Sequence, residues 1–321
     1  MLESSDAKGT ISFVSLPFRR VVGAVGIAVS IIVPNWNGAE ILPECVLSIL
    51  NHTRDIAFEL IIIDNGSTDD SPQIIRQLAG SDDRVKAIFN RENFFFARAC
   101  NQAFEISSGH YLIVSNNDIV VQDNAVKALA DHADAHPDVG VVTPRFCDRM
   151  GVPQEFFRRL PNALFVIAHY HRLGRAVDRF LLGRRIQNAY FLRDRKFDRV
   201  EEVDQPGASF SLVRRRVIEQ IGAFFDERFP LLFNDVDLSY RIKNAGFASH
   251  VLPETRVVHL DGISSLKLDQ SLYQTFLYRG LFEYFRTHHP GQLPFLCLAW
   301  PGRWLEWRRE ADRSRDIEPV Q

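Results

Sequence analysis

The sequence predicts an α/β fold, with helices on both faces of a mainly parallel central sheet and further helices at the C-terminal end. Short apolar segments alternate with helical segments along the first half of the chain, which is typical of such sheets. Four segments have the composition and length of buried strands: Val29–Val33, Glu59–Ile63, Val85–Phe89 and Tyr111–Val114. Four helices should follow them in turn: Ile41–Leu50, Pro72–Leu78, Ala97–Ile106 and Ala125–His132.

Further boundaries follow from local signals. Pro72 suits the first position of its helix because its ring fixes φ, and Ser71 then stands at the N-cap. After Gly246 the pattern returns to strand and then to one long helix, over Ser249–Leu252, Val257–Leu260 and Ser271–Arg286. Residues 1–27 show no clear periodicity and residues 308–321 are mostly charged. We expect an N-terminal extension and a flexible tail there.

Each predicted strand of the first half is followed by a polar segment. These segments are Pro34–Gly38, Asp64–Ser67, Asn90–Phe96 and Asn116–Asp118. The carboxyl ends of parallel strands meet at one edge of a sheet, and ligands of open α/β sheets bind at that edge. The sequence therefore predicts a binding site built from these four segments.

Composition indicates an ordinary globular protein. Of 321 residues, 46% are hydrophobic and 24% charged, and the formal net charge is −2, so no nucleic-acid partner is expected. The four cysteines lie far apart without a CxxC pair, which argues against structural zinc and favours a reducing, cytoplasmic compartment. The apolar stretch Val21–Val33 is shorter than the ~20 residues that span a bilayer, and Pro34 ends it. We interpret it as part of a buried first strand.

Two of the polar segments have chemistry suited to a nucleotide and a cation. In the turn that begins at Asp64, a carboxylate, hydroxyls and free amide groups could contact a base, a ribose or a phosphate. The same residues also build ordinary capping turns. Asn116-Asn117-Asp118 offers one carboxylate beside two amides, which suits a hard divalent cation that also binds a diphosphate. An Asx-rich turn is the alternative, and the other polar strand ends weigh against it.

Two acids and a histidine lie further along the chain. Asp235 and Asp237 stand where an apolar stretch gives way to an amphipathic helix, whose dipole favours a carboxylate at Asp235. A carboxylate at the mouth of a pocket can act as a general base, and we assign that role to Asp235. We interpret Asp237 as the ion-pair partner of Arg241, one turn on. His259 follows an apolar strand and is either a structural histidine or a ligand of the metal or diphosphate.

Together, these motifs resemble inverting family-2 glycosyltransferases of the GT-A fold, in particular their bacterial rhamnosyltransferase-like members. The resemblance covers roughly residues 28–290. It rests, in family order, on VSIIVPNWNG (29–38), IDNGSTD (63–69), NND (116–118), GASFSLVRR (207–215), IGAFFDE (221–227), and NDVDL (234–238) through Ala245-Gly246. It implies a Rossmann-like nucleotide-binding GT-A domain over 28–262, with a donor-nucleotide half (28–145) and an acceptor half (146–262). A C-terminal helical region would span 263–307.

The resemblance also implies roles for individual residues. Asp64 would receive the nucleobase of the donor, Asp118 would hold a Mg²⁺ or Mn²⁺ ion near His259, and Asp235 would be the catalytic base. The other residues expected around the donor nucleotide are Pro34, Trp36, Asn37, Asn65, Ser67, Asn93 and Asn117.

The reaction that the resemblance implies is transfer of one sugar, with inversion, in cell-surface polysaccharide biosynthesis. The donor would be a nucleoside-diphosphate sugar, dTDP- or UDP-linked, and the acceptor a hydroxyl of a glycan or a lipid-linked saccharide. The processive-synthase signature Gln-x-x-Arg-Trp is absent from the sequence. Two alternatives remain: a non-catalytic sugar-nucleotide or glycan-binding module, and a sugar nucleotidyltransferase. The second would need a glycine-rich basic phosphate loop, which Asn35–Ala39 does not provide.

Two positions depart from the family pattern. Asn116 stands where the first aspartate of an Asp-x-Asp motif is usual, so Asp118 is the one carboxylate of that motif. Phe95 stands where a glycine is usual. Because a phenylalanine is strained at positive φ, we expect the loop from Asn93 to Asn101 to differ in shape.

The segment Phe156–Arg199 is aromatic and strongly basic. An apolar helical stripe runs through it, formed by Val166, Tyr170, Leu173, Val177, Phe180 and Leu181, with Arg172, Arg175 and Arg179 on another face. A helix packed on the sheet with a solvated basic side would explain this pattern. The alternatives are contact with the acceptor, with an anionic membrane surface or with a second subunit of a homodimer.

Overall fold

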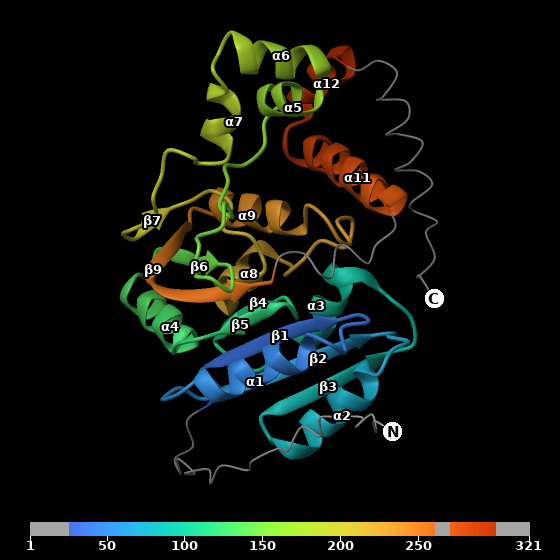
Figure 1. Cartoon of the computed structure of the whole chain (residues 1–321), viewed down its shortest axis with the longest axis vertical. Coiled ribbons are helices and arrows are strands. Elements are labelled where there is room, and N and C mark those ends of the chain that lie inside the picture. Colours follow the sequence, from blue (N-terminus) through green and yellow to red (C-terminus); the bar gives the residue numbers. More distant parts are fainter. Residues whose placement is uncertain (1–25, 261–269, 300–321) are drawn as a thin grey trace, which may run out of the picture.

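The structure, a computed structural model, describes residues 26–260 and 270–299 and confirms the predicted α/β class. Its sheet has nine strands in the order β3-β2-β1-β4-β8-β6-β9-β5, and β7 pairs with β9 (Figure 1). The strands are β1 (Val29–Asn35), β2 (Phe58–Asn65), β3 (Val85–Asn90), β4 (Tyr111–Ser115), β5 (Ile119–Val121), β6 (Val139–Cys147), β7 (Glu201–Glu202), β8 (Phe210–Arg214) and β9 (Ala248–His259). The predicted tail and nearly all of the predicted extension lie outside the described residues.

The helices surround this sheet and extend beyond it. They are α1 (Leu42–His52), α2 (Ser71–Ser81), α3 (Phe95–Ile106), α4 (Ala125–Ala135), α5 (Ala163–Tyr170), α6 (Arg172–Phe180), α7 (Arg185–Tyr190), α8 (Arg215–Ile221), α9 (Asn234–Asn244), α11 (Gln270–His288) and α12 (Leu293–Ala299), with a 3₁₀ turn, η1, at Pro290–Gln292. Within the described ranges, none of these helices combines the length and apolar character needed to cross a membrane.

The four strands predicted for the first half form the parallel part of the sheet. β1 pairs in parallel with β2 and with β4, and β2 pairs in parallel with β3. The register sets Asn35 opposite Asp64. The polar segments after β1, β2 and β4 therefore meet at one edge, as the sequence predicted. β8 joins this part antiparallel to β4, which begins the mixed half of the sheet.

Alternate residues of the strands belong to two separate hydrophobic cores. In β1, Val29, Ile31 and Val33 pack with α1, α2 and α4 on one face, whereas Ile32 packs with α3, α8 and α9 on the other. This two-residue period follows from strand geometry, in which successive side chains point to opposite faces. A third core lies beside the sheet and joins α5, α7, α9, α11 and α12 (Figure 1).

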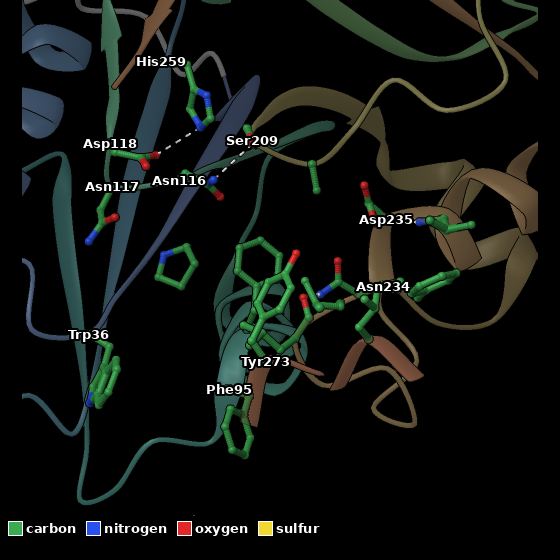
Figure 2. Close-up of a pocket in the computed structure, with 18 of the residues that line it drawn as sticks. Trp36, Phe95, Asn116, Asn117, Asp118, Ser209, Asn234, Asp235, His259 and Tyr273 are labelled. Carbon is green, nitrogen blue, oxygen red and sulfur yellow. Dashed lines mark hydrogen bonds and ion pairs between the residues drawn. The ribbon is translucent and has the colours of Figure 1, made fainter. Parts of the chain in front are cut away.

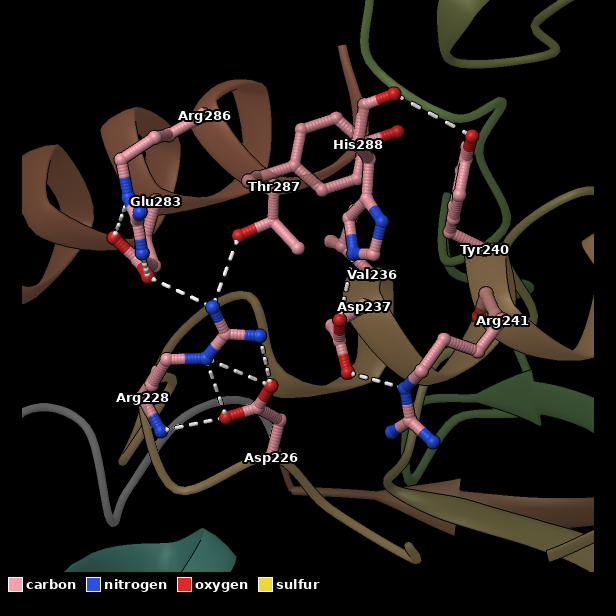
Figure 3. Close-up of polar contacts among 12 residues, drawn as sticks. Asp226, Arg228, Val236, Asp237, Tyr240, Arg241, Glu283, Arg286, Thr287 and His288 are labelled. Carbon is pink, nitrogen blue, oxygen red and sulfur yellow. Dashed lines mark hydrogen bonds and ion pairs between the residues drawn. The ribbon is translucent and has the colours of Figure 1, made fainter. Parts of the chain in front are cut away.

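Polar contacts centred on a buried carboxylate hold α9 against α11 (Figure 3). Asp237 is fully buried, and its two oxygens accept from Arg241 Nε at 2.8 Å and from His288 Nε2 at 2.7 Å. The predicted pairing of Asp237 with Arg241 is confirmed. Arg228, between α8 and α9, contacts Glu283 of α11 at 3.2 Å. Because a buried carboxylate is costly unless it is paired, these contacts fix where the first turn of α9 lies.

Ser71 is not the N-cap that the sequence suggested. α2 begins at Ser71, and Asp70 holds the N-cap position. The buried Ser71 hydroxyl instead accepts from Gly38 N at 3.1 Å, while Ser71 N donates to Asp69 Oδ1 at 3.0 Å. The hydroxyl therefore links the loop after β1 to the start of α2, a contact between distant segments that local capping rules do not predict.

The apolar stripe of the basic segment does not form one helix packed on the sheet; that expectation is wrong. His171 is extended (φ −82°, ψ 134°) and separates α5 from α6, and its Nδ1 accepts from Gly174 N at 3.3 Å. Gly174 lies so close to α5 that a Cβ there would come within 2.2 Å of Ile167 O. Val166 is buried in the third core, whereas Phe180 of α6 is 74% exposed.

Phe95 adopts the positive φ whose strain led us to expect a loop of different shape. Its φ is +62°. Asn93 Oδ1 accepts from Phe95 N at 2.9 Å, and the buried Phe95 ring packs edge-on against Phe276 of α11 with centroids 4.8 Å apart. Burial of the ring and this hydrogen bond offset a backbone strain of about 1–2 kcal/mol.

This conformation predicts an inverted order of stability for two variants. At ordinary helical positions, glycine in place of alanine lowers the free energy of unfolding by about 0.5–1 kcal/mol. At positive φ, by contrast, glycine is the unstrained residue. We expect Phe95→Gly to be more stable than Phe95→Ala by about 1 kcal/mol in urea denaturation, with both below wild type because the ring is lost. Ala103→Gly, in the middle of α3, is the control and should show the usual order. An alanine variant at least as stable as the glycine variant would contradict strain at Phe95.

Candidate active site

A cavity of about 520 Å³ opens at the edge where β1, β2 and β4 end, and the start of α9 and residues of α11 form its other side (Figure 2). Most of the residues that the sequence singled out line it: Pro34, Trp36, Asn65, Asn93, Asn117, Asp118, Asp235 and His259. Asn37, Asp64 and Ser67 do not line the cavity. They adjoin it through Asn35, a lining residue whose Nδ2 donates to Ser67 Oγ at 3.4 Å. The roles of all these residues stay predictions.

Asp118 and His259 meet on one wall because β5 pairs antiparallel with β9. The register sets Ile119, the first residue of β5, opposite His259, the last residue of β9. Asp118 Oδ1 lies 3.5 Å from His259 Nε2, and Leu260 N donates to Asp118 O at 3.0 Å. Asp118 is buried and His259 nearly so. The two residues therefore present a carboxylate and an imidazole side by side.

This pair fits a divalent cation that takes most of its ligands from a substrate. Within residues 26–260 and 270–299, no group of three or more His, Cys, Asp or Glu side chains is arranged to hold a metal ion. Mg²⁺ and its close analogue Mn²⁺ are usually held by one or two carboxylates and complete their octahedral shell with phosphate oxygens and water. The donor set at Asp118 and His259 therefore suits a metal–diphosphate complex better than a permanently bound structural ion.

The loops after β1 and β2 form the adjoining wall and carry an unsatisfied acceptor. Asp64 Oδ2 accepts from Ser67 N at 3.4 Å, whereas the buried Asp64 Oδ1 has no hydrogen-bond partner among the described residues. Burial raises the pKa of the Asp64 carboxyl, and hydrogen bonds from Ser67 and Asn35 oppose that rise. A buried carboxylate oxygen of this kind is costly unless a ligand donates to it.

Asn37, Ser67 and Asn117 support this wall through hydrogen bonds. Asn37 N donates to Ser67 Oγ at 2.8 Å, and Asn37 Oδ1 accepts from Thr68 N at 2.7 Å. Asn117 Nδ2 donates to Asn35 Oδ1 at 2.8 Å. The side-chain amides of Asn35 and Asn117 lie against Gly38, where a Cβ would come within 2.2 Å of Asn35 Oδ1. These contacts hold the ends of β1, β2 and β4 together.

Asn65 and Asn93 organise the loop between β3 and α3. Asn65 Nδ2 donates to Asn93 Oδ1 at 2.7 Å and to Phe95 O at 3.2 Å. Asn65 Oδ1 accepts from Phe94 N at 3.1 Å and from Asn90 Nδ2 at 3.0 Å. Because their carbonyl oxygens are used within the loop, these two amides mainly hold the shape of the cavity wall.

The opposite wall carries Asp235 together with two residues that the sequence did not single out (Figure 2 shows Asp235 facing the cavity across from Asp118). Asp235 lies in the first turn of α9, and its Oδ2 accepts from Gln205 Nε2 at 3.1 Å. Gln205 is buried, and its Oε1 has no partner among the described residues. Two backbone hydrogen bonds of 3.0 and 3.2 Å join Gln205 to Arg158, whose exposed side chain lines the cavity.

Gln205 and Arg158 carry little signal in the sequence. Gln205 lies two residues before the GASFSLVRR motif, with Pro206 between them, while Arg158 is one of many arginines in the basic segment. Three tyrosines complete this side of the cavity: Tyr170, Tyr190 and Tyr273. Aromatic rings beside polar groups are typical of pockets for small polar ligands such as sugars.

Comparison with known families identifies the chain. The model for "Glycosyl transferase family 2" matches residues 30–222. The chain belongs to glycosyl transferase family 2. The match includes the segments after β1, β2 and β4 and ends before Asp235 and His259. The placement of these two family-2 site candidates therefore comes from the tertiary structure.

Curated relatives of this family-2 chain differ in length. N-acetylglucosaminyl-diphospho-decaprenol L-rhamnosyltransferase of Mycobacterium tuberculosis is 27% identical over 279 residues, 82% of this chain and 83% of that enzyme. The uncharacterized protein y4gI of Sinorhizobium fredii is 27% identical over 238 residues, but these are 25% of its own length. The glycosyltransferase GlyG of Streptococcus pneumoniae is 32% identical over 101 residues, 33% of its length.

Solved structures bear out the GT-A fold of this family-2 chain. The mannosyltransferase PcManGT from Pyrobaculum calidifontis, solved with GDP-Man and Mn²⁺, matches with a TM-score of 0.54 and 17% identity, over 82% of this chain and 64% of that one. GalNAc-T7, solved with UDP, GalNAc and Mn²⁺, matches with a TM-score of 0.56 and 16% identity, over 73% of this chain and 43% of that one. At such identities the likeness concerns the fold alone.

Proposed function

We propose that this chain transfers one sugar, with inversion, from a nucleoside-diphosphate sugar to a hydroxyl of a lipid-linked saccharide in polysaccharide biosynthesis. One observation carries the proposal: a carboxylate–imidazole pair and a second carboxylate face the same cavity from opposite walls (Figure 2). A Mg²⁺ or Mn²⁺ ion held by Asp118 and His259 would neutralise charge on the departing diphosphate. Asp235 is free to serve the acceptor on the other side.

The donor wall supports a pyrimidine nucleotide. Asp64 Oδ1 is a buried acceptor without a partner among the described residues, and Trp36 offers an indole ring at the cavity. Uracil and thymine each carry one ring N–H, which suits the single unpartnered oxygen of Asp64, whereas guanine presents its ring N–H and amino group together and would need two acceptors. The faces of both pyrimidines stack on aromatic rings. We therefore propose a UDP- or dTDP-linked donor. PcManGT and GalNAc-T7 were solved with GDP-Man and with UDP, so a nucleotide donor suits this fold.

The acceptor wall supports a single displacement. The acceptor hydroxyl attacks the anomeric carbon, the bond from that carbon to the diphosphate oxygen breaks, and the hydroxyl proton passes to Asp235. Gln205 Nε2 holds one oxygen of Asp235 in place, and Gln205 Oε1 can accept from a second acceptor hydroxyl. The nucleophile and the leaving group lie on opposite faces of the carbon, so its configuration inverts.

Arg158 and the tyrosines support an anionic acceptor. Tyr170, Tyr190 and Tyr273 offer rings against which a sugar can stack, and the exposed Arg158 guanidinium lies beside them. A guanidinium binds a phosphate through paired N–H groups. The name of the Mycobacterium tuberculosis relative specifies an acceptor joined to decaprenol through a diphosphate. An acceptor of that class suits this wall.

A panel of nucleoside diphosphates tests the donor assignment. We expect UDP or dTDP to raise the melting temperature of the protein with Mn²⁺ and to have little effect in chelator, because the ion links the diphosphate to Asp118. A nucleotide concentration of about 100 times Kd raises the free energy of unfolding by about 2.7 kcal/mol. GDP and ADP are the controls. Equal shifts with all four nucleotides, or none, would refute the pyrimidine assignment. A module that only binds would release no nucleoside diphosphate from UDP- or dTDP-sugars.

A further inference from the structure

α6 exposes apolar side chains that a solvated helix would not need. Leu173 is 67% exposed, Phe180 74% and Leu181, at the C-cap, 78%, and Val177 is also exposed. With about 3.6 residues per turn, these positions share one side of the helix. Leu164 of α5 and Phe295 of α12 are also exposed, and α5 contacts both α6 and α12 (Figure 1). Contiguous exposed apolar side chains mark interaction surfaces.

The orientation of α6 is held by its buried side. That side carries Asp178, which is fully buried and accepts from Ile186 N at 3.0 Å and from Gln187 N at 3.3 Å. Gly174, one turn earlier, lies against Ile167 of α5. A rotation of α6 that turned Leu173 and Leu181 inward would expose Asp178 and the amide groups that donate to it. It would also force side chains against α5. The apolar side therefore faces outward in the folded chain as it stands.

Basic side chains form a second exposed side of α6, separate from the apolar one. Arg172, Arg175 and Arg179 are exposed and succeed one another at intervals of about one turn, and Arg179 lies over the Phe180 ring at 5.2 Å. Among the described residues, no ion pair involves any of these three arginines. We name the surface formed by Arg172, Leu173, Arg175, Val177, Arg179, Phe180 and Leu181 the α6 face.

We propose that the α6 face docks the protein on an anionic lipid membrane. Aliphatic and aromatic side chains insert at the boundary between headgroups and acyl chains, while arginines beside them pair with anionic headgroups. Charge complementarity selects this occupant, because a helix that exposes an apolar side and a basic side together fits a negatively charged lipid surface. The face adjoins the proposed acceptor wall, since Tyr170, which lines the cavity, lies two residues before α6. Binding of the α6 face to a membrane does not depend on sugar transfer, so it can be measured in the absence of substrates.

Co-sedimentation of the full chain with vesicles tests the proposal. We expect binding to vesicles of phosphatidylcholine mixed with phosphatidylglycerol, little binding to phosphatidylcholine alone, and loss of binding at high salt. Replacing Arg172, Arg175 and Arg179 with glutamine should lower the partition coefficient on the order of 100-fold. Replacing Leu173, Phe180 and Leu181 with serine should also lower the partition coefficient. This loss should persist at low salt, because the substitutions remove apolar area rather than charge.

A matched control removes the same charge elsewhere. Arg54, Arg76 and Arg91 are exposed, and they lie in the part of the fold built by α1, α2 and β3, at the other end of the molecule from α6 (Figure 1). Their replacement with glutamine should leave vesicle binding within about twofold, because the effect depends on position rather than net charge. Equal losses in both triple variants would overturn the proposal.

Two further outcomes would overturn membrane docking. If the wild type is a dimer in sedimentation velocity and the serine variant is a monomer, with no vesicle binding by either, the face joins two copies of the chain. If wild type and serine variant are both monomers that do not bind vesicles, the face docks neither on a membrane nor on a second copy of the chain. Donor-dependent thermal shifts should be unchanged in every α6 variant, so failure here is distinguishable from failure of the proposed transferase activity.

Discussion

Replacing Asp235 with asparagine is expected to lower kcat by about 10³-fold and to leave donor affinity unchanged. General-base catalysis contributes typically 10²–10⁴-fold, and asparagine cannot take the proton from the acceptor hydroxyl. The change keeps the shape of the side chain and one acceptor oxygen, which can still accept from Gln205 Nε2, whereas the contact of the other oxygen with Val236 N is lost. Initial rates of sugar transfer and titration of the nucleoside diphosphate would measure the two quantities separately.

A nearby carboxylate provides the control for this variant. Asp204 adjoins Gln205 in sequence, does not line the cavity, and pairs with the exposed Lys243. Asp204→Asn should leave kcat within about twofold, because an exposed ion pair contributes little to stability. Turnover of Asp235→Asn within about tenfold of wild type would remove Asp235 from the role of base.

Chelation or loss of Asp118 is expected to have an effect of similar size. EDTA should stop transfer, and Mg²⁺ or Mn²⁺ should restore it, because the ion offsets the charge of the leaving diphosphate by several kcal/mol. Asp118→Asn should lower kcat by about 10²–10³-fold and should remove the Mn²⁺ dependence of nucleotide binding. Calorimetric titration of Mn²⁺ in the presence of UDP measures that dependence apart from activity.

His259→Ala should weaken the same site less than Asp118→Asn. A neutral imidazole supplies a ligand but no charge, whereas Asp118 supplies both, and their contact at 3.5 Å makes them neighbours in one site. Full activity in chelator would mean that cationic side chains stabilise the leaving group instead. The exposed Arg158, on the acceptor wall, would be the first candidate to examine.

Several features of the fold were predictable because they depend on neighbours in sequence. The two-residue alternation of Val29 to Val33 separates the two cores of the sheet, and the strand–helix alternation predicts that β1 to β4 run parallel. The polar ends of those strands meet because parallel strands run in the same direction. Phe95 shows the limit of this reasoning, since its local preference is overridden by a ring contact with α11.

The sequence by itself determined the α/β class, the edge of the sheet at which the cavity opens, and the residue types offered there. The resemblance implied that His259 lies near the metal site. Only the tertiary structure gave its 3.5 Å contact with Asp118, the hydrogen bond from Gln205 to Asp235, and the outward apolar side of α6. The physical reason is the range of the interactions. Strand period and turn chemistry are set within a few residues. The register of β5 against β9, and the burial of Asp178 beneath α6, depend on how distant segments pack against one another.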